Sequence, residues 1–231
     1  MLDFSRFRWM SFDCYGTLID WETGILNAVK ATLAAHGRSL ADEQILENFA
    51  QLEAQAEAGV YKPYREVLEE VVRGFGALQR FRPTDRELRS LPESVKEWRP
   101  FPDTVAALNQ LQARYRLAII SNVDDDLFAA TARRLEVGFD AVITAQQALS
   151  YKPSANNFLL ALERMAAAPE QVLHVAQSLY HDVTPAKALG LATVWVNRRA
   201  GKTGAGATVA ATAAPDLEVP NLQSLATLAK R

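Results

Sequence analysis

Five short apolar segments, most of them rich in β-branched residues, alternate along this chain with segments of helical spacing. The apolar segments cover residues 7–12, 117–120, 139–145, 172–175 and 192–196. Runs of this length fit strands that are buried on both faces, which is the pattern of a parallel sheet. Helical patterns separate the last four of them, at residues 127–135, 157–165 and 185–189. The alternation predicts βαβ units and therefore an α/β fold with a doubly wound parallel sheet.

A long segment between the first two apolar runs has a different pattern. Ile45, Phe49 and Leu52 recur with helical spacing, and residues 64–75 repeat a similar spacing. We therefore expect a helical insertion at residues 19–99, placed on an α/β core made of residues 1–18 and 100–231. The glycine-, alanine- and threonine-rich residues 201–214 predict a mobile surface loop.

Charge and cysteine content exclude several classes of function. The 25 lysines and arginines nearly balance 27 aspartates and glutamates, giving a net charge of −2. This balance argues against a basic nucleic-acid binder and a polybasic membrane anchor. The single cysteine excludes an intrachain disulfide and a multi-cysteine zinc site. With no signal peptide and no apolar stretch of about 20 residues, we expect a cytoplasmic protein with neither nucleic-acid nor membrane partners.

The first apolar run ends in Asp13, followed by Cys14, Tyr15, Gly16 and Thr17. Ligands of open α/β sheets bind just past the carboxyl ends of the strands, so Asp13 is a candidate catalytic carboxylate. A turn in which the aspartate makes local hydrogen bonds is the alternative. Cys14 should face the opposite side of the strand, and we interpret it as a buried thiol rather than a nucleophile.

Three further strand ends also carry polar groups. Ser121 and Asn122 follow the second run, Lys152 follows the third, and His181 and Asp182 follow the fourth. Each has an ordinary alternative: a helix N-cap for Ser121 or Asn122, a surface lysine for Lys152 and a helix-start carboxylate for Asp182. His174, inside the fourth run, reads as a core histidine. Four polar strand ends at one sheet edge nevertheless predict a single site.

These motifs, in this order, resemble those of the haloacid dehalogenase superfamily. The resemblance implies a Rossmann-like core with Asp13 as the nucleophile, and it makes the helical insertion the cap domain. Most members are magnesium phosphatases with two further carboxylates, whereas this chain has Tyr15 and Ala176-Gln177 at those positions. A hard cation needs several charged oxygens, so we expect no metal and no cofactor.

The motif Asp13-Cys14-Tyr15-Gly16-Thr17 is similar to the metal-independent (S)-2-haloacid dehalogenase branch. That resemblance implies that Asp13 displaces halide from C2 of a small carboxylic acid through an ester intermediate. Lys152 and Ser121 would hold Asp13 and the substrate carboxylate, Asn122 and Thr17 would complete the polar shell, and Asp182 would position Lys152 and the hydrolytic water. The other substrate-binding candidates are Tyr15, Trp21, Gln177 and His181.

This chain departs from that branch in the group that would receive the halide. The branch carries a cap arginine, whereas residues 37–64 contain only Arg38, in a connecting segment. A tyrosine expected shortly after Lys152 is Phe158 here, and Gln177 and Leu179 replace a serine and an asparagine.

Residues 12–22 and 178–182 look closer to a sister group that includes L-azetidine-2-carboxylate hydrolase. There the same aspartate opens a strained ring, and a tryptophan at the position of Trp21 shapes the pocket; a core aromatic is the alternative reading of Trp21. We rank the dehalogenase first, ring hydrolysis second, a magnesium phosphatase third and a non-catalytic binder of small acids last. Homodimers are frequent in the superfamily, which makes a homodimer the assembly to test.

Overall fold

Six parallel strands form one sheet in the computed structural model, which describes residues 2–230. Their order across the sheet is β3-β2-β1-β4-β5-β6. The strands are β1 (Trp9–Phe12), β2 (Arg116–Ser121), β3 (Ala141–Thr144), β4 (Val172–Ala176), β5 (Ala192–Val196) and β6 (Leu217–Val219). The chain crosses the sheet in both directions from β1, which confirms the predicted doubly wound α/β fold.

Alternate residues of each strand pack on opposite faces of this sheet, as strand geometry requires. Met10 and Phe12 belong to the apolar cluster on one face, whereas Trp9 belongs to the cluster on the other. Helices α8 (Ala155–Met165) and α9 (Thr184–Ala188) cover the face of Trp9. Helices α5 (Thr104–Gln112) and α10 (Leu222–Leu228) pack together on the face of Met10. Helices α6 (Asp125–Leu135) and α7 (Ala145–Ala148) follow β2 and β3.

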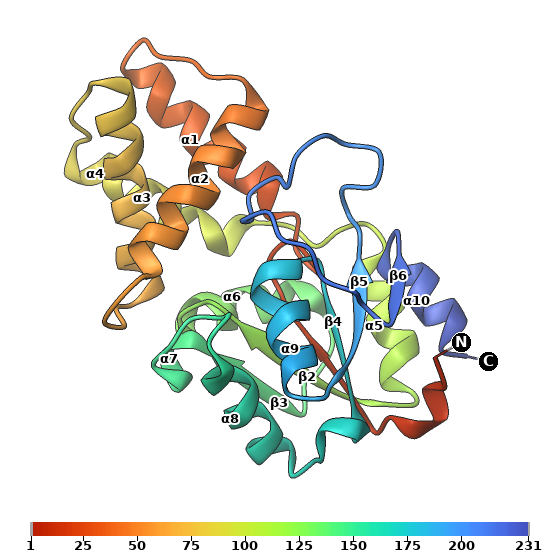
Figure 1. The fold of residues 1–231 in the computed structure, drawn as a ribbon. Helices are drawn as coiled ribbons and strands as arrows, with labels where there is room; N and C mark the ends of the chain where they lie inside the picture. The colour runs from red at the N-terminus through yellow and green to blue at the C-terminus, as the bar shows by residue number, and fades with distance from the viewer. Residues whose placement is uncertain (1, 231) are drawn as a thin grey trace.

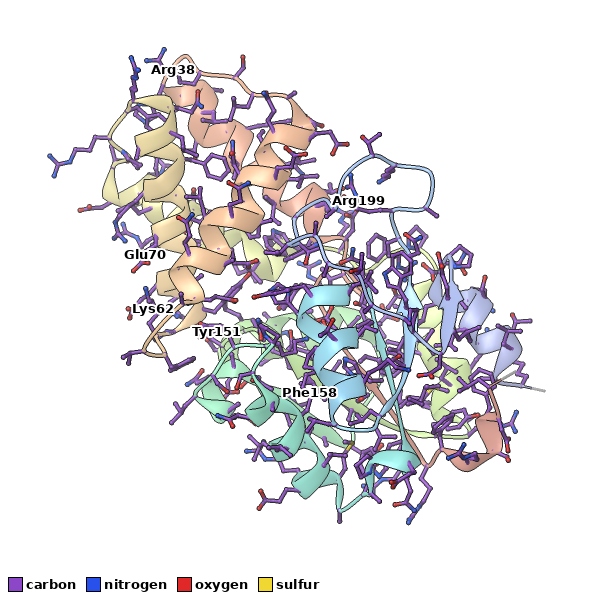
Figure 2. All side chains as sticks on the ribbon, in the orientation of Figure 1. Arg38, Lys62, Glu70, Tyr151, Phe158 and Arg199 are labelled. Carbon is purple, nitrogen blue, oxygen red and sulfur yellow. The ribbon has the colours of Figure 1, made fainter. Side chains whose placement is uncertain are left out.

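The long insertion contains four helices that stand apart from the sheet (Figure 1). They are α1 (Trp21–Ala35), α2 (Asp42–Glu57), α3 (Tyr64–Gln79) and α4 (Asp85–Ser94). Several hydrogen bonds join these helices to the sheet domain, and two of them involve the buried side chains of Asp124 and Arg199. The buried Asp124 carboxylate accepts the Tyr64 backbone N–H at 2.8 Å, and the Arg199 guanidinium, near the junction in Figure 2, donates to Glu22 at 2.7 Å. The exact limits 19–99 stay a prediction.

The structure also differs from the sequence-based expectations. β1 starts at Trp9 rather than residue 7, and β3 covers only 141–144 of the expected 139–145. The strand β6 and helix α10 were not anticipated. Residues 201–214 are irregular as expected, but the expectation of a surface loop is wrong for Ala207 and Thr208, which are buried. The Thr208 hydroxyl lies 3.1 Å from that of Ser178, and this bond draws the loop inward.

Within residues 2–230, every helix is too short or too polar to cross a bilayer.

Candidate active site

A small pocket lies where the carboxyl ends of the strands meet α1, α2 and α3. Its free space is about 30 Å³, on the scale of one or two water molecules, so only a small ligand could enter it. A larger groove between α1 and α4 contains none of the residues that line this pocket. The lining residues are Asp13, Tyr15, Trp21, Glu53, Glu57, Tyr64, Ser121, Asn122, Lys152, Gln177, Ser178, His181 and Asp182. Polar groups from all four predicted strand ends therefore meet in one place.

A buried lysine joins two carboxylates at the centre of this pocket. The Lys152 ammonium donates to Asp13 Oδ1 at 3.0 Å, to Asp182 Oδ1 at 2.6 Å and to the Ile120 carbonyl at 2.8 Å. Asp13 reaches this position because its backbone N–H extends the ladder to β4, bonding the Val175 carbonyl at 3.1 Å. The surface alternative for Lys152 is wrong, because its side chain is 1 % exposed. Asp182 does lie in the first turn of a short helix, residues 179–183, but its buried carboxylate is also bonded to Lys152.

These contacts also set the charge states of the three groups. Burial disfavours the Lys152 ammonium, but the charges of Asp13 and Asp182 outweigh burial and raise its pKa. Burial would raise the pKa of Asp182, but Lys152 and His174 lower it overall. Burial, assisted by the nearby Asp182 charge, raises the pKa of Asp13 against the opposing effect of Lys152. Asp182 therefore carries the more firmly fixed negative charge of the pair.

Lys152, predicted together with Ser121 to hold Asp13 and the substrate carboxylate, has no free donor hydrogen in this structure. An ammonium has three donor hydrogens, and the three bonds above use all of them. Ser121 differs, because its buried hydroxyl has no hydrogen-bond partner among the described residues. An unpaired buried hydroxyl is costly, so Ser121 is the group in this pocket that is ready for a ligand.

Two other predicted residues, Thr17 and Asn122, have their side chains hydrogen-bonded to other groups of the site. The Thr17 hydroxyl donates to Asp13 Oδ2 at 2.6 Å and accepts the Gln177 backbone N–H at 2.9 Å. The Asn122 amide accepts the Lys152 backbone N–H at 2.8 Å and donates to the Lys152 carbonyl at 3.1 Å. Neither Asn122 nor Ser121 caps α6, whose N-cap is Asp124. Both carboxylate oxygens of Asp13 are thus fixed.

Trp21 and Gly16 depend on each other at the wall of the pocket. Gly16 has φ +89°, and a Cβ there would lie 2.7 Å from the Trp21 indole nitrogen, so only glycine fits. The indole packs edge-on against Phe49 of α2 with ring centroids 5.8 Å apart. Trp21 is therefore a core aromatic and a pocket wall at the same time.

The remaining two candidates, Tyr15 and His181, are neutral in the physiological range. The Tyr15 hydroxyl lies 2.8 Å from Thr131 Oγ1, and burial raises the pKa of Tyr15 well above its ordinary value despite the opposing effect of that hydrogen bond. Burial lowers the pKa of His181 to about 4. Cys14 belongs to the apolar cluster and does not line the pocket, in agreement with its interpretation as a buried thiol.

Five residues at this site were not identified as candidates; one of them, Ser178, lines the pocket from the fourth strand end. His174, expected only as a core histidine, is fully buried between Ser11 Oγ at 2.9 Å and Asp182 Oδ1 at 3.0 Å, so it also orients Asp182. Glu53, Glu57 and Tyr64 line the pocket from the helical insertion. The sequence pattern could have identified Glu53 and Glu57, because Ile45, Phe49, Glu53 and Glu57 repeat every four residues and so share one helix face.

The donor set does not fit the magnesium site that the resemblance to magnesium phosphatases would imply. The two extra carboxylates of that site are replaced by Tyr15, whose hydroxyl is bound to Thr131, and by the Ala176-Gln177 pair. Lys152 also places its ammonium directly on Asp13. Residues 2–230 contain no cluster of three histidine, cysteine or acidic side chains arranged for a metal.

No arginine from the described chain lines the pocket. Figure 2 shows Arg38 at the far end of the helical insertion, remote from the strand ends. Phe158 is fully buried and packs edge-on against His174 with centroids 5.1 Å apart, so it supports the sheet and does not face the pocket.

Comparison with known proteins identifies the family of this arrangement. A family model described as haloacid dehalogenase-like hydrolase matches residues 7–190. The (S)-2-haloacid dehalogenase 1 of Pseudomonas sp. (strain CBS-3) is 29% identical over 193 residues, covering 81% of this chain and 83% of that protein. The phosphoglycolate phosphatase of Shigella boydii is 27% identical over 210 residues, covering 84% and 82%.

Solved structures show the same fold. The L-2-haloacid dehalogenase of Xanthobacter autotrophicus, with chloropropionic acid covalently bound, matches with a TM-score of 0.80 and 23% identity. The match covers 97% of this chain and 98% of that one.

Proposed function

Because this chain belongs to the haloacid dehalogenase-like hydrolases, we propose that it hydrolyses a bond at C2 of a small 2-substituted carboxylic acid. The reaction that its relatives favour is the displacement of halide from an (S)-2-haloacid. Asp13 is the nucleophile, and the reaction proceeds through an ester of Asp13. One observation carries the proposal: Asp13 is fixed by Lys152 and Thr17 at a pocket where the buried Ser121 hydroxyl has no partner.

The chemistry follows from these contacts. The Ser121 hydroxyl donates to the substrate carboxylate and so places C2 beside Asp13. A carboxylate oxygen of Asp13 attacks C2 from the side opposite the leaving group, which inverts the configuration and forms the ester. Water then attacks the carbonyl carbon of that ester and releases the 2-hydroxy acid. The Lys152 ammonium stabilises the negative charge that develops on Asp13 in this second step. A halide leaves as a stable anion and needs neither a metal nor a proton donor.

A second candidate is the ring opening of L-azetidine-2-carboxylate by the same aspartate. The observation that favours it is the wall opposite Asp13, where the insertion provides Glu53 and Glu57 and no cation. A wall of glutamates suits a departing amine better than a departing anion.

A single turnover in heavy-oxygen water tests the nucleophile. Enzyme in excess over (S)-2-chloropropionate, with EDTA present, should place the solvent oxygen in the peptide that contains Asp13, as measured by mass spectrometry. Solvent oxygen that enters only the product, with the Asp13 peptide unlabelled, would exclude an ester intermediate.

Two variants complete this experiment. Asp13→Asn should lower chloride release by at least about 10⁴-fold, the scale of removing a covalent nucleophile. Cys14→Ala, the adjacent buried residue outside the pocket, is the matched control and should retain chloride release. Equal activity in both variants would contradict the assignment of Asp13.

A further inference from the structure

The insertion side of the pocket is acidic, although the pocket faces a carboxylate nucleophile. The thirteen lining residues include four carboxyl groups, from Asp13, Glu53, Glu57 and Asp182, against the single ammonium of Lys152. That ammonium is already committed to Asp13, Asp182 and the Ile120 carbonyl. No described arginine or lysine therefore remains on the insertion side to receive a departing anion.

Glu53 is a buried insertion residue held by a single side-chain hydrogen bond. Its side chain is buried, and its Oε1 accepts a 2.6 Å hydrogen bond from the Tyr64 hydroxyl. Tyr64 is itself anchored, because its backbone N–H bonds to the buried Asp124 carboxylate at 2.8 Å. Among residues 2–230, no group bonds to Glu53 Oε2. One oxygen is thus held and the other is available to a ligand.

The surroundings of Glu53 hold it in the protonated form at neutral pH. The pKa of Glu53 is raised to about 8, mainly by burial; the Asp13 charge adds to the rise and the Tyr64 hydrogen bond opposes it. Burial and the neighbouring Glu53 also raise the pKa of Glu57. The ionisable groups that share the pocket with Glu53 are Asp13, Tyr15, Glu57, Tyr64, Lys152, His181 and Asp182.

The pocket has a second feature that indicates a ligand. The Ser121 hydroxyl is fully buried, lines the same space and has no partner, so it is ready for the carboxylate of a substrate. A molecule held there by its carboxylate has its C2 beside Asp13 and its leaving group toward the remaining wall. That wall is the one formed by Glu53, Glu57 and Tyr64.

Resting on the second candidate proposed above, ring opening at C2 by Asp13, we propose that Glu53 is the acid that protonates the ring nitrogen as it leaves C2. Asp13 forms a bond to C2 while the C2–N bond breaks, and the electron pair of that bond stays on nitrogen. The ring nitrogen enters unprotonated, takes the Glu53 proton as the bond breaks and leaves as a tethered primary amine beside the Glu53 carboxylate. Water then cleaves the Asp13 ester, and the proton released in that step restores Glu53. A ring is required because an unstrained amine at C2 is a poor leaving group for a carboxylate nucleophile.

Two substrates that differ in the leaving group at C2 test whether Glu53 acts as a proton donor. The probes are L-azetidine-2-carboxylate, which loses a ring nitrogen, and (S)-2-chloropropionate, which loses chloride. Glu53→Gln should lower kcat for ring opening by about 100-fold or more, the scale of losing a general acid. Chloride release should change by less than about 3-fold, because a stable anion needs no proton. Glu47→Gln, an exposed glutamate on the same helix α2, is the matched control and should affect neither reaction.

The pH profile separates proton donation from a merely structural role. In the unsubstituted protein, kcat for ring opening should fall as the pH rises through about 8, where Glu53 loses its proton. Chloride release should lack this fall. Tyr64→Phe, which keeps Glu53, should move the fall to higher pH because the lost hydrogen bond had lowered the pKa of Glu53. This second variant keeps the test decisive if Glu53→Gln folds poorly.

The outcomes distinguish this inference from the function on which it rests. Equal losses for both substrates in Glu53→Gln, or an unchanged pH profile, would overturn the role of Glu53. Solvent oxygen in the Asp13 peptide from chloropropionate, with no ring opening at all, would overturn the nitrogen leaving group and leave Asp13 in place. No label in that peptide from either substrate would overturn both proposals.

Discussion

The two walls of the pocket satisfy their polar groups in different ways. On the sheet side, Lys152 makes three hydrogen bonds, and Asp182 is further held by His174. On the insertion side, Glu53 has one hydrogen-bond partner and no cation. A fully hydrogen-bonded network fixes the Asp13 nucleophile in one geometry. A side chain with a free hydrogen-bonding atom, such as Glu53, can instead interact with the leaving group. The sheet side thus determines how the bond is attacked, and the insertion side determines what can leave.

Removing the cation of the sheet side is the largest test of this contrast. Lys152→Met leaves Asp13 and Asp182 buried without a positive partner, so we expect the free energy of unfolding to fall by about 3–5 kcal/mol. Urea denaturation measures the loss. Lys187→Met is the matched control, because Lys187 pairs with Asp216 at 2.8 Å on the surface and should cost at most about 1 kcal/mol. Equal losses in the two variants would show that the buried network is not specially stabilising.

The insertion side should make stability depend on pH in the direction opposite to an ordinary carboxylate. Between about pH 4.5, its ordinary pKa, and about pH 8, the folded protein keeps the Glu53 proton that the unfolded chain has released. The free energy of unfolding therefore falls as the pH rises through this window, by about 1.4 kcal/mol per pH unit from this group. Above pH 8 both states are ionised and the loss is complete.

Urea denaturation at pH 5.5, 6.5 and 7.5 measures this slope. Glu53→Gln should flatten the pH dependence, whereas Glu47→Gln, on the exposed face of the same helix, should not. Parallel curves for Glu53→Gln and the unsubstituted protein would mean that Glu53 is ionised in the folded state.

The smallest expected effect is on substrate binding at the sheet side. Ser121→Ala removes a hydroxyl that has no partner in the folded protein, so the free energy of unfolding should not decrease. KM for (S)-2-chloropropionate should rise by about 10- to 100-fold, the value of a hydrogen bond to a charged group, with a smaller change in kcat. Ser224→Ala, on α10 at the opposite end of the fold, should leave KM unchanged. A fall in stability without a change in KM would assign Ser121 to the core.

The sequence predicted the sheet side of the site more completely than the insertion side. Asp13, Ser121, Lys152 and Asp182 each follow an apolar run, and parallel strands end at the same edge, so their meeting could be inferred without coordinates. Glu53 was missed because a glutamate in a helix is normally solvated, although its spacing from Ile45 and Phe49 placed it on the buried face. The strand β6 was missed because three residues at a sheet edge, Leu217–Val219, give too short a pattern.

The amino-acid sequence by itself determined the α/β fold, the helical insertion and the order of polar strand ends, because hydrophobic periodicity and strand-end placement are local properties. Only the tertiary structure decided how these groups share their hydrogen bonds. It showed that all three donor hydrogens of Lys152 are used and that the Ser121 hydroxyl makes no hydrogen bond within residues 2–230. It also showed that Glu53 is buried beside Tyr64. Donor counts, burial and the resulting pKa shifts depend on groups far apart in the chain, and no local pattern encodes them.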